Sequence, residues 1–205
     1  MKEGGICALT GQVSLILASA SPRRVELLAQ IGVTPDQILP AHVDEVALND
    51  ERPIDMARRL ADAKAQEIQK AHPGACIIGA DTVVAVGRRI LGKAEDEAQA
   101  RAYLTLLSGR SHRVIGGIAI LAPGRISVIK AITTKVHFKR LSAEEIDGYI
   151  ASDEWRDKAG AYAIQGRAGA FVKSINGSYS NVVGLAVHEV ANTLKGIGIH
   201  PAGLI

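Results

Sequence analysis

LILASASPRR, residues 15–24, joins an apolar run directly to a candidate helix start. Its first four residues are typical of a short buried strand. Ser21 can cap the helix that follows, Pro22 suits its first residue, and Gly32 suits the position just past its end. Because a buried strand followed at once by a helix opens many α/β folds, this segment sets the expected architecture.

The rest of the chain continues the alternation of strands and helices. We expect helices over 54–70, 96–107, 142–150 and 187–194, and strands over 75–86, 112–121, 126–141 and 170–175. Residues 142–145 match a capping box, and the dipeptide Asn176-Gly177 predicts a tight turn after the last strand. Because helices and strands alternate early and strands pair later, the sequence predicts an α/β fold with a mixed twisted sheet and flanking helices.

Length and composition favour a single globular domain. The chain has 205 residues, of which 47% are hydrophobic and 22% charged, so it is long enough to bury a sizeable core. We expect residues 1–13 to be an N-terminal leader and residues 14–205 to form one domain. The sequence shows neither a signal-peptide pattern nor an apolar run of membrane-spanning length, so we expect a cytoplasmic protein without membrane contact.

The same composition argues against several classes of protein. The net charge is 24 − 21 = +3, too small for a nucleic-acid carrier, and aromatic residues make up only 3%, too few for stacking on single-stranded RNA or DNA. We therefore expect no nucleic-acid polymer as a partner. Cys7 and Cys76 lack metal-ligand spacing, and the six histidines form no i, i+3 or i, i+4 pair, which disfavours a Cys- or His-based metal site.

Four residues at the start of the first helix form a candidate anion site: Ser19, Ser21, Arg23 and Arg24. A helix N-terminus presents free backbone N–H groups and the positive end of the helix dipole. Two hydroxyl groups and two guanidinium groups beside it suit a phosphate. The alternative is a solvated helix start with an ordinary serine cap.

A carboxylate interrupts the apolar run 76–86 at Asp81, directly before Thr82. Burying a carboxylate is costly unless a metal, a cation or a hydrogen bond meets it. Asp81 is therefore a candidate general base or magnesium ligand at a strand end that faces a cleft. The alternative is a structural aspartate at a bulge.

Two lysines and a glutamine complete the candidates. Lys64 lies on the apolar stripe of helix 54–70, so its ammonium group must extend to solvent or meet an anion. Lys93 lies between a strand and a helix, where it can reach a phosphate or stay solvated. Gln165 lies among small residues in 157–166, where the backbone can approach a ligand closely and the amide offers both a donor and an acceptor.

Six short blocks, in this order, resemble the Maf family of nucleotide pyrophosphatases. They are LASASPRR (17–24), GADT (79–82), GK (92–93), LSG (107–109), DKAGAYAIQG (157–166) and NGSYSNVVGL (176–185). The resemblance implies an α/β fold of two lobes around a cleft, similar to the inosine triphosphate pyrophosphatases. It also implies hydrolysis of a nucleoside triphosphate to the monophosphate and pyrophosphate, with a divalent metal cation, Mg²⁺ or Mn²⁺.

The resemblance also implies roles for particular residues. The family's catalytic acid corresponds to Asp81, and its cleft residues correspond to Ser19, Ser21, Arg23, Arg24, Glu45, Lys64, Lys93 and Gln165. Asp81 and Glu45 would hold the metal. Members similar to this sequence at Arg23, Thr82 and Gln165 act on dTTP and UTP, which implies the pyrimidine branch of the family, with dTTP, UTP and modified pyrimidine nucleotides as the expected substrates. A homodimer is the usual assembly.

Several alternatives stay open from the sequence. The same chemistry could act on 7-methyl-GTP or another non-canonical nucleotide, although that branch carries different residues at the three positions. A nucleotide-binding regulator of septum formation is a rival of another class, but a mere binder needs no carboxylate among four cations. Ala94 and Ala186 stand where the family usually has proline, which affects backbone rigidity more than chemistry.

Overall fold

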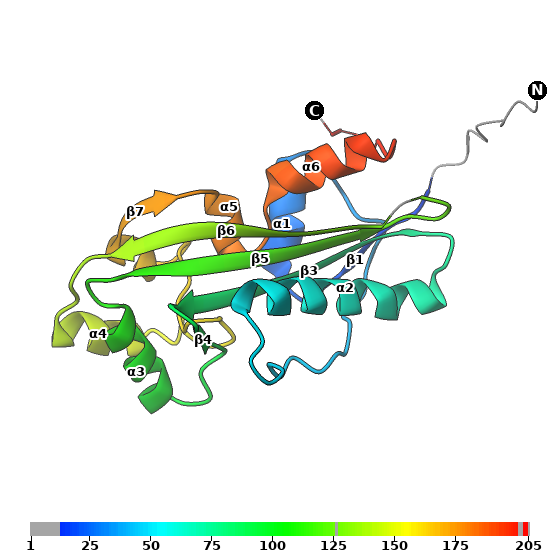
Figure 1. The fold of residues 1–205 in the computed structure, drawn as a ribbon. Coiled ribbons are helices and arrows are strands. Elements are labelled where there is room, and N and C mark those ends of the chain that lie inside the picture. The colour runs from blue at the N-terminus through cyan, green and yellow to red at the C-terminus, as the bar shows by residue number, and fades with distance from the viewer. Residues whose placement is uncertain (1–12, 126, 201–202, 205) are drawn as a thin grey trace, which may run out of the picture.

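The fold is a seven-stranded mixed sheet with helices on both faces (Figure 1). A computed structural model describes residues 13–125, 127–200 and 203–204, so the predicted leader lies outside the described residues except for Val13. The strands are β1 (Leu15–Ala18), β2 (Gln37–Ile38), β3 (Cys76–Val86), β4 (Arg89–Leu91), β5 (Ser111–Leu121), β6 (Val128–Phe138) and β7 (Val172–Asn176). The helices are α1 (Pro22–Gln30), α2 (Pro53–Ala71), α3 (Glu97–Leu107), α4 (Ala143–Ile150), α5 (Tyr179–Val183) and α6 (Val187–Gly196), with a 3₁₀ helix, η1, at Arg167–Phe171.

The sheet is parallel at one end and antiparallel at the other. Its order is β2-β1-β3-β5-β6-β7, and β4 pairs with β3 outside this path. β1 is parallel to β2 and β3, whereas β4, β5, β6 and β7 pair in antiparallel fashion. The predicted mixed α/β class is therefore confirmed. Among the described residues, no helix is both long and apolar enough to span a membrane.

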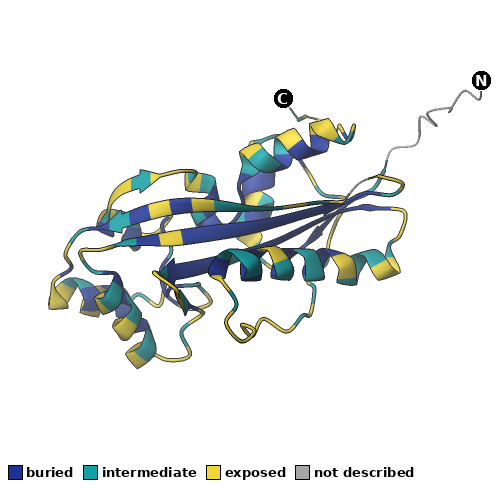
Figure 2. Cartoon of the chain, viewed as in Figure 1, coloured by how far each residue is buried: buried dark blue, intermediate teal, exposed yellow. Residues whose placement is uncertain are grey.

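Successive residues of β3 point to opposite faces of the sheet, and different helices cover those faces. Ile77, Val83 and Ala85 pack in the clusters that contain α2. Ile78 and Val84 pack in the larger cluster that contains α1, α5 and α6. β3 is buried along almost its whole length, as Figure 2 shows. A side chain on this strand consequently meets either α2 or the α1 side, depending on its position.

Small residues let α2 lie close to the sheet. A Cβ atom at Gly117 would lie 1.8 Å from the backbone oxygen of Ala57, and one at Gly79 would lie 2.3 Å from that of Ala61. Neither position therefore tolerates a side chain at this spacing. Because Gly117 is the cross-strand partner of Asp81, the close approach brings α2 directly over that carboxylate.

A gap in strand pairing exposes the middle of β3. The pairing of β1 ends where Ala18 meets Gly79, and β4 begins to pair where Leu91 meets Val84. Between these points β3 is paired on the β5 side but with no described strand on the other. Residues 80–83 therefore form a free strand edge in the interior of the fold, where a ligand can approach the backbone and side chains.

Most predicted elements are confirmed with bounds shifted by a few residues. The capping box is present with both of its hydrogen bonds: the Ser142 side chain accepts from the Glu145 backbone N–H, and the Glu145 side chain accepts from the Ser142 backbone N–H. The strand predicted over 170–175 is wrong at its start, because residues 170–171 belong to η1. The strand predicted over 126–141 is shorter, since β6 ends at Phe138, just after an irregular register between His137 and Phe138, while residue 126 is not described. The turn at Asn176-Gly177 leads into α5 rather than a hairpin.

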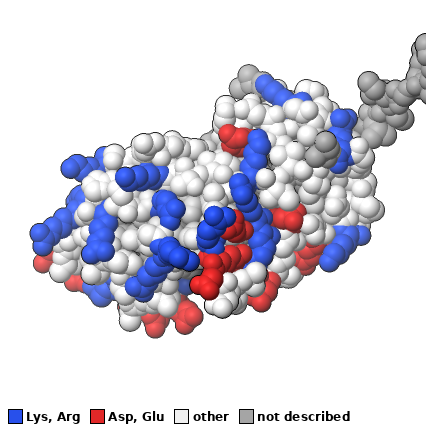
Figure 3. Space-filling model, in the orientation of Figure 1, with Lys and Arg blue, Asp and Glu red and all other residues white. Residues whose placement is uncertain are grey.

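The small net charge is unevenly distributed over the surface. Figure 3 shows lysine and arginine side chains gathered over the end of the molecule that carries α3, α4 and β7, with few acidic side chains beside them. Exposed basic residues at this end include Arg110, Arg113, Lys135, Arg140 and Lys173. The net charge of +3 therefore describes the surface incompletely, and the expectation of no nucleic-acid partner stays a prediction.

Candidate active site

All of the predicted site residues line one cavity of about 1030 Å³ beside the free edge of β3. They are Ser19, Ser21, Arg23, Arg24, Glu45, Lys64, Asp81, Thr82, Lys93 and Gln165. Residues of β1, α1 and α2 line the cavity from one end of the sheet, and residues of β4 and the loop 157–165 line it from the other. The cavity thus lies between two groups of elements, as the expected two-lobed cleft requires.

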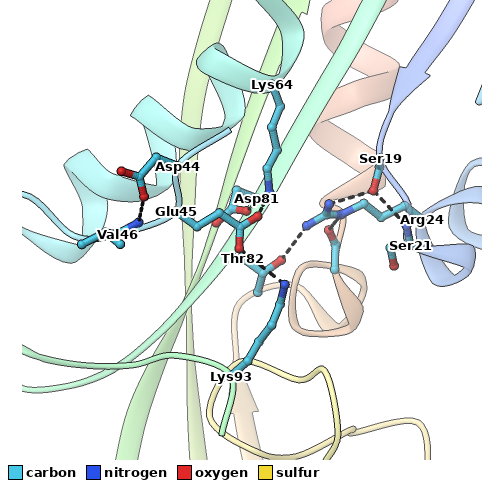
Figure 4. Close-up of polar contacts among 11 residues, drawn as sticks. Ser19, Ser21, Arg24, Asp44, Glu45, Val46, Lys64, Asp81, Thr82 and Lys93 are labelled. Atoms are coloured by element: carbon cyan, nitrogen blue, oxygen red, sulfur yellow. Dashed lines mark hydrogen bonds and ion pairs between the residues drawn. The ribbon is translucent and has the colours of Figure 1, made fainter. Parts of the chain in front are cut away.

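Arg24 is the centre of one half of the site. Its side chain is buried, and its guanidinium donates to the Gly184 carbonyl from Nε at 2.9 Å, to Ser19 Oγ from Nη1 at 2.9 Å, and to Thr82 Oγ1 from Nη2 at 3.3 Å (Figure 4). All three acceptors are neutral oxygens. Burial lowers the pKa of Arg24, while the charges of Asp81 and Glu45 oppose that effect. Without a carboxylate in direct contact, this buried cation is suited to an anionic ligand.

The start of α1 is arranged differently from the predicted cap. Ser21 occupies the N-cap position and Pro22 the first turn, but the Ser21 side chain makes no capping hydrogen bond. Instead, Ser19 Oγ accepts from the Ser21 backbone N–H at 3.2 Å and from Arg24. Arg23 is half-buried, and burial lowers its pKa against the opposing charges of Glu26 and Asp157. The Ser19 hydroxyl therefore organises the anion site, and the Ser21 side chain does not cap the helix.

Lys64 is the centre of the other half. Its Nζ donates to Asp81 Oδ1 and to Glu45 Oε1, both at 2.6 Å, and Lys93 Nζ lies 3.4 Å from Glu45 Oε2. Lys64 and Asp81 are both buried, whereas Glu45 and Lys93 are partly open to solvent. Of the two outcomes left open for Lys64, the structure shows contact with anions. Asp81 is not at a strand end, as predicted, but in the middle of β3, where the pairing gap makes it accessible.

Glu45 comes from a segment without regular secondary structure and is held by its cationic neighbours. Burial raises the pKa of Glu45, but the hydrogen bonds and charges of Lys64 and Lys93 outweigh that effect, so the pKa lies below its usual value. The carboxylate is therefore ionised near neutral pH. Figure 4 shows Glu45 reaching between Lys64 and Lys93 from the side opposite Arg24.

The carboxylate pair has the donor set of a magnesium site. Among the described residues, no group of three or more His, Cys, Asp or Glu side chains is placed to hold a metal alone. Asp81 and Glu45, however, contact the same ammonium nitrogen and both line the cavity. Mg²⁺ is commonly held by one or two carboxylates, with water and substrate phosphates completing its coordination. The residues present therefore fit a magnesium ion that a phosphorylated ligand helps to bind.

Gln165 faces the cavity from the loop that follows α4. Its side chain is exposed and makes no hydrogen bond to another described residue, so its amide is free to meet a ligand. The loop backbone is held to β4 and the segment after it, because the Gly160 N–H donates to the carbonyls of Leu91 and Gly92 at 3.0 Å, and Ala159 pairs with Lys93. This contact fixes Gln165 and Lys93 on the same side of the site.

Several groups at the cavity were not singled out from the sequence, Gly184 and Tyr162 among them. Gly184 supplies a backbone carbonyl to Arg24, and no side-chain signal marks such a group. Tyr162 lines the cavity from within the block 157–166, but a tyrosine in a small-residue loop has no pattern of its own. The sequence indicates the block 157–166 as a whole, and only the tertiary contacts show which role Tyr162 has within it.

Fold and site together define an α/β protein with a polar cleft that combines a buried, uncompensated guanidinium and a pair of carboxylates. The family model described as "Maf-like protein" matches residues 14–197, so the chain belongs to the Maf-like protein family. A relative from Paramagnetospirillum magneticum is 58% identical over 188 residues, covering 91% of this chain and 98% of its own, and is named dTTP/UTP pyrophosphatase. A relative from Caulobacter vibrioides with the same name is 54% identical, covering 92% and 97%.

Solved structures support the fold. The Ham1 protein of Staphylococcus aureus matches with a TM-score of 0.50 at 15% identity, covering 89% of this chain and 98% of its own. A HAM1 protein from Coxiella burnetii gives a TM-score of 0.50 at 14% identity, covering 90% and 99%. At these identities the likeness concerns the fold alone, and it extends over almost the whole of both chains.

Proposed function

We propose that this protein is a nucleoside triphosphate pyrophosphatase that hydrolyses dTTP and UTP to the monophosphate and pyrophosphate. The observation that carries the proposal is the pairing of Arg24, a buried cation without a carboxylate partner, with the Asp81–Glu45 carboxylates across the free edge of β3. The names and high identity of the two relatives support the same reaction and the same substrates.

The cations of the cleft suit a triphosphate. A nucleoside triphosphate carries roughly four negative charges, and its transfer reactions depend on positioning and charge stabilisation more than on covalent chemistry. Arg24, Arg23 and Lys93 line the cavity, and Lys64 lies beside the carboxylates. We assign Arg24 and Lys93 to the phosphates, with Ser19 orienting Arg24 and Ser21 at the helix start.

Asp81 is the residue best placed to act on the attacking water. One of its carboxylate oxygens accepts from Lys64 Nζ, while the other makes no hydrogen bond within the described residues and can accept a proton. Mg²⁺, or Mn²⁺ in its place, would be held by Asp81 and Glu45 and would offset the charge of the substrate phosphates. Attack on the α-phosphorus then leaves pyrophosphate as the departing group.

Base recognition falls to Thr82 and Gln165. Uracil and thymine present one N–H between two carbonyl groups, which an amide and a hydroxyl or backbone group can match. Thr82 lies at the free edge of β3, and Gln165 lines the same cavity from the loop 157–166. Arg23, half-buried and lining the same cavity, is the third position that we assign to substrate choice.

A panel of nucleoside triphosphates tests the proposal. The purified protein is incubated with Mg²⁺ and dTTP, UTP, CTP, GTP, 7-methyl-GTP and dITP, and pyrophosphate release is measured. We expect dTTP and UTP to be the best substrates. Preference for 7-methyl-GTP would assign the chain to the alternative substrate. Binding of nucleotides without any turnover would favour a regulatory binding protein, as the septum-formation alternative requires.

Two finer points stay proposals. We infer a homodimer from the family resemblance, and a cytoplasmic location as expected from the sequence. Light scattering at micromolar concentration tests the first inference, since a homodimer has twice the mass of the 205-residue chain. Fractionation of cells that express the tagged protein tests the second.

A further inference from the structure

The scarce aromatic residues of this chain gather behind the loop that carries Gln165. Both phenylalanines and two of the four tyrosines lie in one edge-to-face cluster with His112. Ring centroids are 4.9 Å apart for Phe138 and Tyr162, and 5.4 Å apart for His112 and Tyr162. These spacings are favourable for aromatic pairs. The cluster therefore forms a rigid support on the core side of Tyr162.

His112 makes one specific polar contact in this support. It lies on β5, is 2% exposed, and its Nε2 lies 2.8 Å from the Tyr162 hydroxyl. Its Nδ1 is buried without a partner in the described residues. Burial, together with the nearby His137, lowers the pKa of His112 to about 4, so the imidazole is neutral at physiological pH. An unpaired buried nitrogen is a cost that packing alone does not explain.

The loop held by Tyr162 contains unusual backbone conformations. Asp157 and Ala161 have positive φ angles of 56° and 57°, which non-glycine residues rarely adopt. The backbone N–H of Ala163 donates to the Tyr149 hydroxyl at 3.0 Å, so a second tyrosine of the same cluster also holds the loop by a hydrogen bond. Gln165 follows two residues later. A strained segment that carries a ligand-facing side chain needs such external contacts to persist.

We propose that His112 is a positioning residue that acts through the Tyr162 hydroxyl to hold the loop 157–166, and with it Gln165, in the conformation that receives the pyrimidine base. This inference rests on the proposed function, because it names the device that supports base recognition in that site. His112 itself does not line the cavity and touches no substrate. A residue whose only role is packing would affect stability, whereas a positioning residue affects loop order and substrate choice.

Tyr162→Phe tests the contact directly, because it keeps the ring and removes only the hydroxyl. The double variant Tyr162→Phe/His112→Leu removes both polar groups. It therefore leaves no buried imidazole nitrogen without a hydrogen-bond partner at this position, and its stability should return to that of the wild type. Ser111→Ala is the matched control: it removes a hydroxyl from the neighbouring β5 position, where Ser111 Oγ lies 3.1 Å from His137 Nδ1, and does not touch the loop. Each variant is measured for melting temperature, amide hydrogen exchange and kcat/KM on UTP and CTP.

We expect amide exchange in residues 157–166 to be roughly 5-fold faster in Tyr162→Phe, since a hydrogen bond that holds the loop is lost. We expect kcat/KM on UTP to fall about 10-fold, mainly through KM, with a smaller change on CTP. The double variant should regain the wild-type melting temperature and yet keep the fast exchange and the weakened preference for UTP. Ser111→Ala should match wild type in loop exchange and in the preference for UTP, whatever its melting temperature.

Three results would overturn the inference: loop exchange in Tyr162→Phe equal to wild type, a double variant with wild-type exchange and UTP preference, or activity losses that follow melting temperature alone. Failure of the proposed function is a separate outcome. If the wild type hydrolyses neither UTP nor dTTP, the substrate assignment fails. The exchange measurement then still decides whether the His112–Tyr162 contact holds the loop.

Discussion

Neighbouring residues of β3 build two halves of the site that treat charge in opposite ways. On the α2 face, Asp81 shares the Lys64 ammonium with Glu45, so the positive charge there is compensated at two contacts of 2.6 Å. On the α1 face, Thr82 contacts Arg24, whose acceptors are all neutral. The first half is a charge-neutralised cluster, and the second is a buried cation that lacks an anion.

This difference in charge compensation indicates a different role for each half of the site. A buried cation with neutral partners contributes little to stability, because desolvation opposes its hydrogen bonds, but it is ready to bind a phosphate. A carboxylate shared between cations holds its geometry before substrate arrives, as catalysis by positioning and electrostatics requires. Substitutions in the two halves should therefore separate in their effects on activity and on stability.

Asp81→Asn should have the largest effect. It keeps the size of the side chain but removes its charge, so proton acceptance and metal binding fail together. We expect kcat on UTP with Mg²⁺ to fall about 10³-fold, within the range for a lost general base. The melting temperature should also fall, because Lys64 keeps Glu45 as its only carboxylate. A folded variant with near-full turnover would make Asp81 a structural residue.

Arg24→Met should produce a loss of activity with little loss of stability. Methionine retains apolar bulk beside Ser19 and Thr82 but cannot bind phosphate. We expect kcat/KM to fall by an amount that corresponds to a loss of about 2–3 kcal/mol in transition-state stabilisation. This is the order of a lost contact to a desolvated charge. Urea unfolding at pH 7 should change far less, with Arg24→Lys as the charge-retaining control. Inactivity that is explained wholly by unfolding would contradict the phosphate role.

Gln165→Glu tests whether the pyrimidine base is recognised by Gln165, in the half of the site that contains Thr82. The change replaces the amide donor with an acceptor, so a uracil carbonyl would face a carboxylate, which penalises pyrimidines most. We expect kcat/KM on dTTP and UTP to fall about 10-fold more than on GTP and 7-methyl-GTP. Equal losses on all four substrates would show that Gln165 does not recognise the base.

The smallest of these expected effects is the change in the free energy of unfolding caused by Glu45→Gln, which depends on pH. Because the folded pKa of Glu45 is below 4.5, its ionised form stabilises the folded state above about that pH, and the contribution is lost as the pH falls through the folded pKa. Its side chain is 42% exposed, so we expect a difference of less than about 1 kcal/mol at pH 7 that becomes smaller as the pH is lowered to 3. Urea unfolding at both pH values measures it. A difference that grows on acidification would contradict the sign.

The strands and helices with long hydrophobic patterns could be predicted from sequence, whereas short elements could not. β2 has two residues, β4 three and α5 five, too few for a period to be visible. The boundary between η1 and β7 was missed because Phe171 and Val172 are both apolar and continue one run. Local composition does not tell a 3₁₀ turn from a strand there.

The site residues were predicted by type and neighbourhood, but their partners were not. Lys64 meets Glu45 and Asp81 across sequence separations of 19 and 17 residues, so helix periodicity could place its side chain but not choose its contacts. The accessibility of Asp81 depends on where β1 ends and β4 begins, which is a property of sheet pairing. Ser19, rather than Ser21, supplies the organising hydroxyl, because its Oγ accepts from both the Ser21 backbone N–H and Arg24.

Product analysis in ¹⁸O-water tests the central claim most directly. The protein is incubated with dTTP and Mg²⁺, and the products are separated and weighed by mass spectrometry. We predict dTMP and pyrophosphate in equal amounts, with the ¹⁸O atom in dTMP, because water attacks the α-phosphorus beside Asp81. Release of dTDP and orthophosphate, or ¹⁸O in pyrophosphate, would contradict the account, since either result places the attack on another phosphorus.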